Sequence, residues 1–269
     1  MKPGTHILYC RCANAAVIPE EVQRAVSAAL AGRADVTTVE DFCAVAAKRD
    51  PRLEQLIACE RLIVVACHPR AVRWLFRWAG MPLDEAKAVF FDMRRQSAPE
   101  ILAGLSEAGT VALPSNVNSE PATCSTGVAA DGQAADDWVP WFPVIDYDRC
   151  RQCRQCLSFC LFGVYAISPD NRVIVANPRG CKNNCPACSR ICPEVAVMFP
   201  KLTEAEAPLN GAEIGNEPDL KARAQINVRE ILGDDIHAAL AGRQQEARKR
   251  RLRRPSVEQA ESERALHNT

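Results

Sequence analysis

The cysteines of this chain are concentrated in one short stretch, since eight of the fourteen fall between residues 150 and 192. They form two groups with the spacings C-x2-C-x2-C-x3-C and C-x3-C-x2-C-x3-C, and Pro193 follows the second. The groups are Cys150, Cys153, Cys156 and Cys160, then Cys181, Cys185, Cys188 and Cys192. Three closely spaced thiolates can hold one 4Fe–4S cube, and a fourth one helical turn later can reach a neighbouring cube. The pattern therefore predicts two 4Fe–4S clusters that carry single electrons.

On this repeat, residues 144–200 resemble the bacterial-type two-cluster ferredoxin domain. The resemblance implies an α+β ferredoxin-like fold whose ligands cross between the repeats. One cluster would then be held by Cys150, Cys153, Cys156 and Cys192, and the other by Cys181, Cys185, Cys188 and Cys160. It also implies a β-hairpin, which the runs 164–168 and 172–175 around Pro169-Asp170-Asn171 predict by themselves.

Two features depart from that family and leave the loop geometry open. Leu161 follows Cys160, where the family often has proline, and the second group opens with three intervening residues instead of two. Two zinc ions are an alternative occupant of eight cysteines. The triple Cys181, Cys185 and Cys188 also matches the spacing of radical S-adenosylmethionine enzymes, but that chemistry needs an open iron and a large barrel.

Basic side chains lie in and beside the repeats: Arg149, Arg151, Arg154, Arg172, Arg179, Lys182 and Arg190. The acidic ones there are Asp146, Asp148, Asp170 and Glu194. Positive charge near an anionic cluster favours its reduced form and so raises the reduction potential. The same side chains could instead be a solvated surface or a docking face for an acidic partner.

Residues 1–103 alternate between strand-like and helix-like segments, which predicts a small α/β domain with a parallel sheet. The expected strands are Thr5–Tyr9, Asp35–Val39, Arg61–Ala66 and Ala88–Met93. The expected helices are Pro19–Leu30, Asp41–Lys48, Leu53–Cys59 and His68–Ala79. The β-branched run Arg61–Ala66 is typical of a strand buried on both faces.

Four further cysteines, Cys10, Cys12, Cys43 and Cys67, follow or lie near the ends of these strands. Strand carboxyl ends meet at one edge of a parallel sheet, so the four thiols are expected to converge. Segments 10–12, 42–43 and 64–70 resemble the N-terminal domain of the large flavoprotein subunit of heterodisulfide reductase, over residues 5–95. That resemblance implies a third iron–sulfur cluster. Buried apolar thiols, a zinc site and a redox-active thiol are the alternatives, and Cys59 and Cys124 stay unassigned.

Dinucleotide and nucleotide fingerprints are absent, because the chain has neither a G-x-G pair nor a P-loop. We therefore expect no flavin or NAD site in this chain. We expect it to be an electron carrier or an accessory subunit of an oxidoreductase. Its partners would be donor and acceptor proteins, which could belong to a heterodisulfide-reductase-like complex. One alternative is a component of a redox enzyme that acts on a thiol or disulfide at the N-terminal cysteines. Another is an interaction scaffold with structural clusters.

The sequence pattern also predicts the boundaries of the dicluster domain, a linker before it and a polar extension after it. Residues 104–138 read as a linker with one helix near its start, and residues 139–201 as the dicluster domain. Residues 202–269 read as a polar extension, helical over Val228–Leu240, with a basic run from Arg248 to Arg254 and a disordered tail. The net charge is zero, so nucleic acid is not favoured. No membrane span or export signal is apparent, and a cysteine-rich chain of this kind is expected in the reducing cytoplasm.

Overall fold

The computed structural model describes residues 4–108 and 138–215, with a few isolated positions from 235 to 245. The chain divides into an α/β unit, residues 1–144 with 199–213, and a cysteine unit, residues 145–198 with 214–269. The predicted linker, the predicted helix 228–240, the basic run and Cys124 lie wholly or mostly outside the described residues. Among the described residues, no helix has the length and apolar character needed to cross a membrane.

The α/β unit alternates strands and helices as the sequence predicts. Its elements are β1 (Thr5–Cys10), α1 (Glu20–Leu30), β2 (Val36–Val39), α2 (Phe42–Ala47), α3 (Arg52–Ile57), β3 (Arg61–Ala66), α4 (Pro69–Trp78), β4 (Ala88–Asp92) and α5 (Ala98–Glu107). The bounds of the predicted strands and helices agree within two residues. Helix α5 starts before the predicted linker and runs into it, and a capping box of Ser97 and Glu100 fixes its start.

The four strands form one parallel sheet in the order β2-β1-β3-β4, which confirms the predicted small parallel sheet. Strand β3 is buried along its whole length except at Arg61, in agreement with its β-branched sequence. The chain moves from β1 to β2 on one side and then crosses to β3 on the other. The direction in which the chain adds strands to the sheet therefore reverses between β1 and β3. This position is called the switch point, and ligand sites of open α/β sheets form there.

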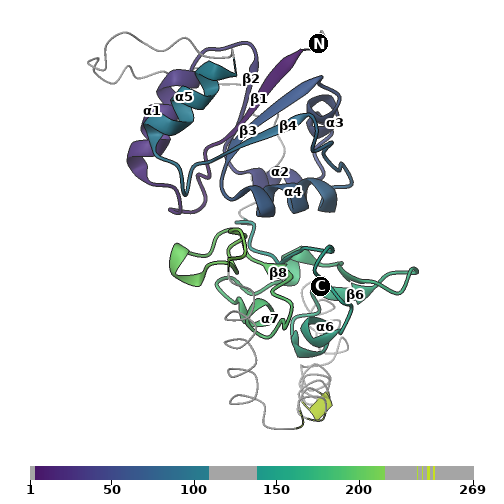
Figure 1. The fold of residues 1–269 in the computed structure, drawn as a ribbon. Helices are drawn as coiled ribbons and strands as arrows, with labels where there is room; N and C mark the ends of the chain where they lie inside the picture. The colour runs from purple at the N-terminus through teal and green to yellow at the C-terminus, as the bar shows by residue number, and fades with distance from the viewer. Residues whose placement is uncertain are drawn as a thin grey trace, which may run out of the picture. The chain divides into compact units, whose positions relative to one another are not determined.

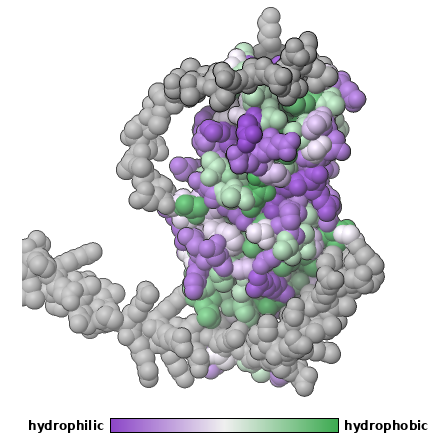
Figure 2. Space-filling model, turned by 90° about the vertical axis from the view of Figure 1, so that its left-hand side faces the viewer, coloured by the Kyte–Doolittle hydropathy of each residue, from purple (hydrophilic) through white to green (hydrophobic). Residues whose placement is uncertain are grey.

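Helices cover both faces of this sheet (Figure 1). Helices α1 and α5 pack together on one face, where Val22, Val26 and Leu30 of α1 meet a core that includes Ile7 and Ile63. Helices α2 and α4 pack together on the other face, with the rings of Phe42 and Phe76 4.7 Å apart. On the side shown in Figure 2, hydrophilic residues predominate and hydrophobic ones are interspersed.

A segment distant in sequence, residues 199–213, completes the α/β unit. The Arg94 guanidinium donates hydrogen bonds to the carbonyls of Pro200 (2.9 Å) and Leu202 (2.6 Å). The fully buried His68 ring lies between Asp92 and Glu204, with one carboxylate oxygen 2.9 Å from each ring nitrogen. The sequence pattern assigns residues 199–213 to the dicluster domain and the extension, whereas in the structure they pack with the α/β unit.

The cysteine unit is built from short elements. They are β5 (Val144–Ile145, at its edge), α6 (Gln155–Phe159), β6 (Tyr165–Ile167), β7 (Val173–Val175), the 3-10 turn η1 (Pro178–Gly180), α7 (Ala187–Arg190) and β8 (Val197–Met198). Strands β5 and β8 pair, and β6 and β7 form an antiparallel ladder. This ladder confirms the predicted hairpin, and Asn171 in its turn takes the left-handed conformation (φ 60°).

The contact between Gly211 and Ala71 tests how tightly residues 199–213, called the returning segment below, pack against helix α4. Gly211 has φ +94°, and a Cβ added there would overlap the Ala71 side chain and lie 3.2 Å from the Ala71 Cα. We predict that Gly211→Ala lowers the free energy of unfolding by about 2–5 kcal/mol, about 1–2 from the left-handed backbone and about 1–3 from overpacking. All four tryptophans belong to the α/β unit, so urea unfolding followed by tryptophan fluorescence measures the effect.

The matched control is Gly80→Ala, because Gly80 also has a left-handed backbone (φ +88°) but faces open space. We expect Gly80→Ala to lower the free energy of unfolding by only about 1–2 kcal/mol, which is the cost of the left-handed backbone. Equal losses in the two variants would contradict close packing of Gly211 on α4.

Candidate metal centres

The first cysteine set surrounds a cavity in the cysteine unit. The cavity has a volume of about 370 Å³, including its open mouth. Its lining contains Cys150, Cys153 and Cys156 from the first repeat together with Cys192 from the end of the second. Apolar side chains, Ile145, Val173 and Val197, complete part of the wall. Four thiols around one space form a donor set that suits an iron–sulfur cube.

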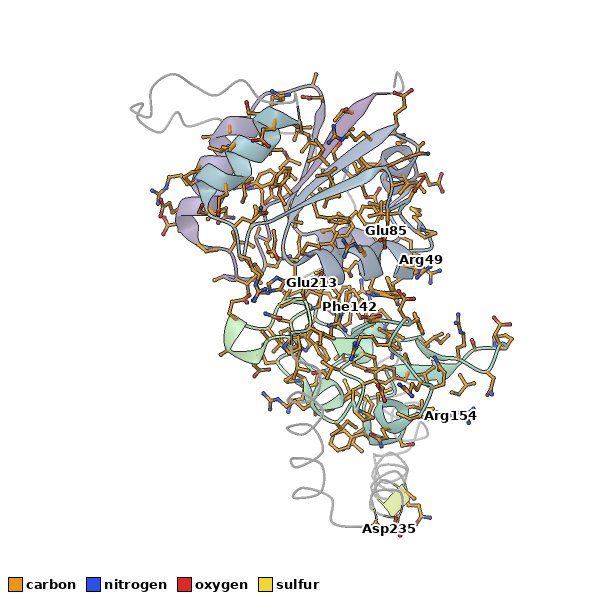
Figure 3. All side chains as sticks on the ribbon, viewed as in Figure 1. Arg49, Glu85, Phe142, Arg154, Glu213 and Asp235 are labelled. Atoms are coloured by element: carbon orange, nitrogen blue, oxygen red, sulfur yellow. The ribbon has the colours of Figure 1, made fainter. Side chains whose placement is uncertain are left out.

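The loop that carries this set turns sharply around Cys153. Gln152 (φ 57°) and Arg154 (φ 62°) on either side both have left-handed backbones, which costs a non-glycine residue about 1–2 kcal/mol. Helix α6 then begins at Gln155 and presents the buried Cys156 in its first turn. Arg154, labelled in Figure 3, extends from this bend and donates a 2.6 Å hydrogen bond to Asn171. Strain at this position is expected where a binding site dictates the backbone.

The Gln152 side chain links the hairpin to the first set. Its amide oxygen accepts a 2.7 Å hydrogen bond from the backbone N–H of Val173, and its amide nitrogen donates to Cys150 Sγ at 3.4 Å. At the other end of the set, the backbone N–H of Ala196 donates to Cys192 Sγ at 3.3 Å. Donors to ligand sulfurs help to set the reduction potential of a cluster. No sequence pattern identifies Gln152, because only the fold brings it to the hairpin.

The second cysteine set gathers in the same unit. Cys160 directly follows α6, and its sulfur is close enough to Cys181 and Cys188 to affect both thiols electrostatically. Burial raises the pKa of Cys181 to about 12, as it does for Cys156 in the first set. A buried thiol resists ionisation in this way, and coordination of a metal by the thiolate relieves the resistance.

Tyr165 on β6 lies between the two sets. Its buried hydroxyl faces Cys188, and it also interacts electrostatically with Cys156 of the first set and Cys160 of the second. Among the described residues, this hydroxyl has no hydrogen-bond partner of ordinary geometry. Burial is the main cause that holds the pKa of Tyr165 well above its usual value. Tyr165 stands in the hairpin that the sequence predicts, but no local pattern marks it as a contact of the cysteines.

A site for a single metal ion needs its ligands closer together than a 4Fe–4S cube does. In the part of the chain that the structure describes, no three histidine, cysteine, aspartate or glutamate side chains converge closely enough to hold one metal ion. A 4Fe–4S cube makes a different demand, because each thiolate bonds its own iron at a separate corner. Its ligands surround a space, as the first set does.

The four N-terminal cysteines come together in the α/β unit, at the switch point of the sheet. Cys10 ends β1, Cys67 directly follows β3, Cys43 lies in α2, and all four are buried. The thiols of Cys10 and Cys12 share a hydrogen bond that raises the pKa of Cys10 and lowers that of Cys12. Cys67 interacts electrostatically with Cys10, Cys12 and Cys43. The backbone N–H of Phe42 donates to Cys10 Sγ at 3.2 Å.

Side chains of both charges lie near the third set, which is formed by the four N-terminal cysteines. Lys201, from the returning segment, forms an ion pair with Asp41, and both side chains are buried (5% and 2% exposed). Asp41 raises the pKa values of Cys12 and Cys43 more than its partner Lys201 lowers them, and burial raises that of Cys43 further. Arg94 lowers the pKa values of Cys12 and Cys67, although burial of Cys67 has the larger effect on that thiol. No local pattern marks Lys201, which lies far along the chain. Cys59 is partly exposed, and its thiol donates to the carbonyl of Gln55.

Comparison with known proteins matches the region that carries the first two sets. Residues 142–210 match the 4Fe-4S dicluster domain family, so this region is an iron–sulfur, ferredoxin-like domain, which implies electron transfer. The chain is also similar to an uncharacterized ferredoxin of Methanocaldococcus jannaschii, with 46% identity over 63 residues. The match covers 23% of this chain and 42% of that protein, so the chain spans less than half of its relative.

These matches confirm a 4Fe-4S dicluster domain in this region, and they do not test the predictions made for the rest of the chain. The matched family range begins at residue 142, beyond residues 5–95, for which the resemblance to the flavoprotein subunit of heterodisulfide reductase was drawn. That resemblance therefore stays a prediction.

The buried ion pair beside the third set gives a stability prediction. Lys201→Met should lower the free energy of unfolding of the α/β unit by about 3–5 kcal/mol, because it leaves the Asp41 carboxylate buried without a counter-charge. Lys201→Met combined with Asp41→Asn should lose less, because the amide carries no charge and can still cap α2, where Asp41 accepts from the N–H of Ala44. Urea unfolding by tryptophan fluorescence gives both values.

The control is Arg24→Met, which removes an exposed ion pair with Glu20 and should cost no more than about 1 kcal/mol. If the single Lys201 variant lost no more than the Arg24 variant, the pair with Asp41 would not support the returning segment.

Proposed function

We propose that this chain passes single electrons between partner proteins through two 4Fe–4S clusters with crossed ligands. Cys150, Cys153, Cys156 and Cys192 would hold one cluster, and Cys181, Cys185, Cys188 and Cys160 the other. The observation that carries the proposal is the cavity whose lining combines three cysteines of the first repeat with the last cysteine of the second. The proposal includes donor and acceptor proteins and a cytoplasmic location.

When bound, 4Fe–4S clusters supply reversible one-electron redox chemistry at potentials that the protein tunes. The side chains around them would do the tuning. Gln152 and the backbone N–H of Ala196 donate hydrogen bonds to Cys150 and Cys192, which favours the more negative, reduced form. Buried Tyr165 interacts electrostatically with cysteines of both sets, so its ring would be part of the apolar surroundings of both clusters.

The proposal extends to a third iron–sulfur cluster on Cys10, Cys12, Cys43 and Cys67. Three observations support it: the four thiols gather at the switch point, all are buried, and Arg94 supplies positive charge that lowers the pKa values of Cys12 and Cys67. An anionic cluster needs such compensating charge when it is buried. A chain built in this way is an accessory subunit that relays electrons, for example within a heterodisulfide-reductase-like complex.

A free catalytic thiol at the same place is the less favoured alternative. Burial raises the pKa of Cys43 and Cys67, and the hydrogen bond with Cys12 raises that of Cys10. The same hydrogen bond lowers the pKa of Cys12, but Cys12 is buried. A nucleophilic cysteine needs the opposite, an accessible thiolate with a lowered pKa. Reduction of a disulfide that depends on Cys43 or Cys67 would revive that alternative.

The crossed ligation predicts how paired alanine variants behave. Cys153→Ala with Cys192→Ala removes two ligands of one cluster, so the pair should lose about four irons, no more than either variant alone. Cys185→Ala with Cys192→Ala removes one ligand from each cluster and should lose about eight. Iron and sulfide are counted after anaerobic purification, and electron paramagnetic resonance shows whether one isolated reduced cluster remains.

Uncrossed ligation gives the opposite result, since the Cys153 pair would then lose both clusters and the Cys185 pair only one. Cys59→Ala is the control and should keep all its iron, because Cys59 belongs to none of the three sets. A colourless protein loaded with zinc would end the electron-transfer proposal altogether.

The third cluster is tested by total iron. The fully loaded chain should hold about twelve irons with three clusters and about eight with two. Cys67→Ala should lower the total by about four irons and leave the spectra of the other clusters unchanged. A wild-type total near eight, unchanged in the Cys67 variant, would limit the chain to two clusters.

A further inference from the structure

We propose that the cysteine unit docks an acidic electron-transfer protein through a surface patch made of Leu161, Phe162, Arg179 and Lys182. The patch lies beside the second cysteine set, so the inference rests on the proposed function of that set. The inference goes beyond that function because it says where electrons enter or leave the chain. It also gives the charge of the partner protein that delivers or accepts them.

The apolar part of the patch is unusual for a solvent-facing loop. Leu161 and Phe162 are 43% and 40% exposed, and they directly follow the ligand candidate Cys160. Only four large apolar side chains among the described residues are this exposed, and the patch holds two of them. A pair of neighbouring exposed apolar side chains of this kind is a candidate contact for another protein.

The basic part of the patch comes from the segment that packs against this loop. A Cβ added to Gly180 would lie 3.0 Å from the backbone oxygen of Phe162, so the two backbones are in close contact. Arg179 and Lys182 flank the pair Gly180-Cys181, and both are exposed. The apolar and the basic side chains therefore border the same cysteines, Cys160 and Cys181.

Charge decides which kind of partner fits. Between residues 149 and 193 the chain has a single acidic residue, Asp170, in the hairpin turn. The patch combines an apolar centre with a positive rim, and such a surface complements an acidic protein with an apolar contact of its own.

The patch also suits electron exchange. Cys160 and Cys181 are partly exposed, so a protein seated on Leu161 and Phe162 would bring its redox group close to the second cluster. Complementary charge speeds the encounter of the two proteins and makes the rate depend on salt.

The test compares two forms of one electron acceptor, cytochrome c, which is basic, and succinylated cytochrome c, whose lysines are converted to carboxylates. The reduced holoprotein is mixed anaerobically with each form in a stopped-flow spectrometer. Each event oxidises one reduced cluster and reduces one ferric haem, so no further reactant is needed. We expect the succinylated form to react faster, and its rate to fall as salt is added.

Variants then locate the docking site. Arg179→Glu with Lys182→Glu should slow reduction of the succinylated form by roughly tenfold and speed that of the native form. Phe162→Ser should slow both forms, because it removes the apolar contact without changing charge. Arg24→Glu with Arg61→Glu, an equal charge change at exposed sites of the α/β unit, and Ile167→Ser, an exposed apolar change on the hairpin, are matched controls that should react like the wild type.

Two results would overturn the docking surface while leaving the clusters in place. One is equal rates for both forms of cytochrome c at low salt, and the other is a patch variant that reacts like its matched control. Oxidation by a small neutral quinone and the iron content should be unchanged in every variant, which shows that the clusters are intact. Failure of the proposed function looks different, since a chain without redox-active clusters would reduce neither cytochrome nor the quinone.

Discussion

The short reach of a cysteine side chain constrains the whole cysteine unit. A thiol extends only two bonds from the backbone, so four of them can surround one space only if the backbone itself bends around it. The left-handed residues Gln152 and Arg154 provide that bend in the first repeat, and Asn184 provides one before Cys185 in the second. The helices are short for the same reason, since α6 and α7 hold only the turn needed to aim their cysteines. The strands are short as well, and they form two separate pairs, β5 with β8 and β6 with β7.

Charge and burial form the second constraint, and they act on the α/β unit as well. Thiols are easily buried while neutral, but a site that uses thiolates must supply positive charge or hydrogen-bond donors. In the α/β unit these come from Arg94 and from the backbone N–H of Phe42 that points at Cys10. In the cysteine unit they come from backbone and amide donors at Cys192 and Cys150. Backbone N–H donors to a cysteine sulfur therefore occur in both units.

The features that sequence reasoning recovered are those that local patterns encode. The β-branched run of β3, the stripe of α1 and the turn residues of the hairpin each determine their own element, and cysteine spacing alone marked the dicluster domain. Gln152, Tyr165 and Lys201 were missed because their importance comes from partners that folding brings near them. Lys201 meets Asp41, which is 160 positions away, and no periodicity records such a meeting. The unit boundaries were hard for the same reason, since residues 199–213 pack against Arg94 and His68.

The return of residues 199–213 to the α/β unit has a consequence for the order of biosynthesis. The cysteine unit's core, residues 145–198, is inserted into the sequence of the α/β unit. During translation all eight of its cysteines are made before the segment that carries Lys201 and Glu204. Chains fold progressively from the N-terminus as they are made, yet here the first domain to begin is completed only after the inserted one has been synthesised. Iron–sulfur assembly on the inserted residues can therefore begin while the α/β unit still lacks its final segment.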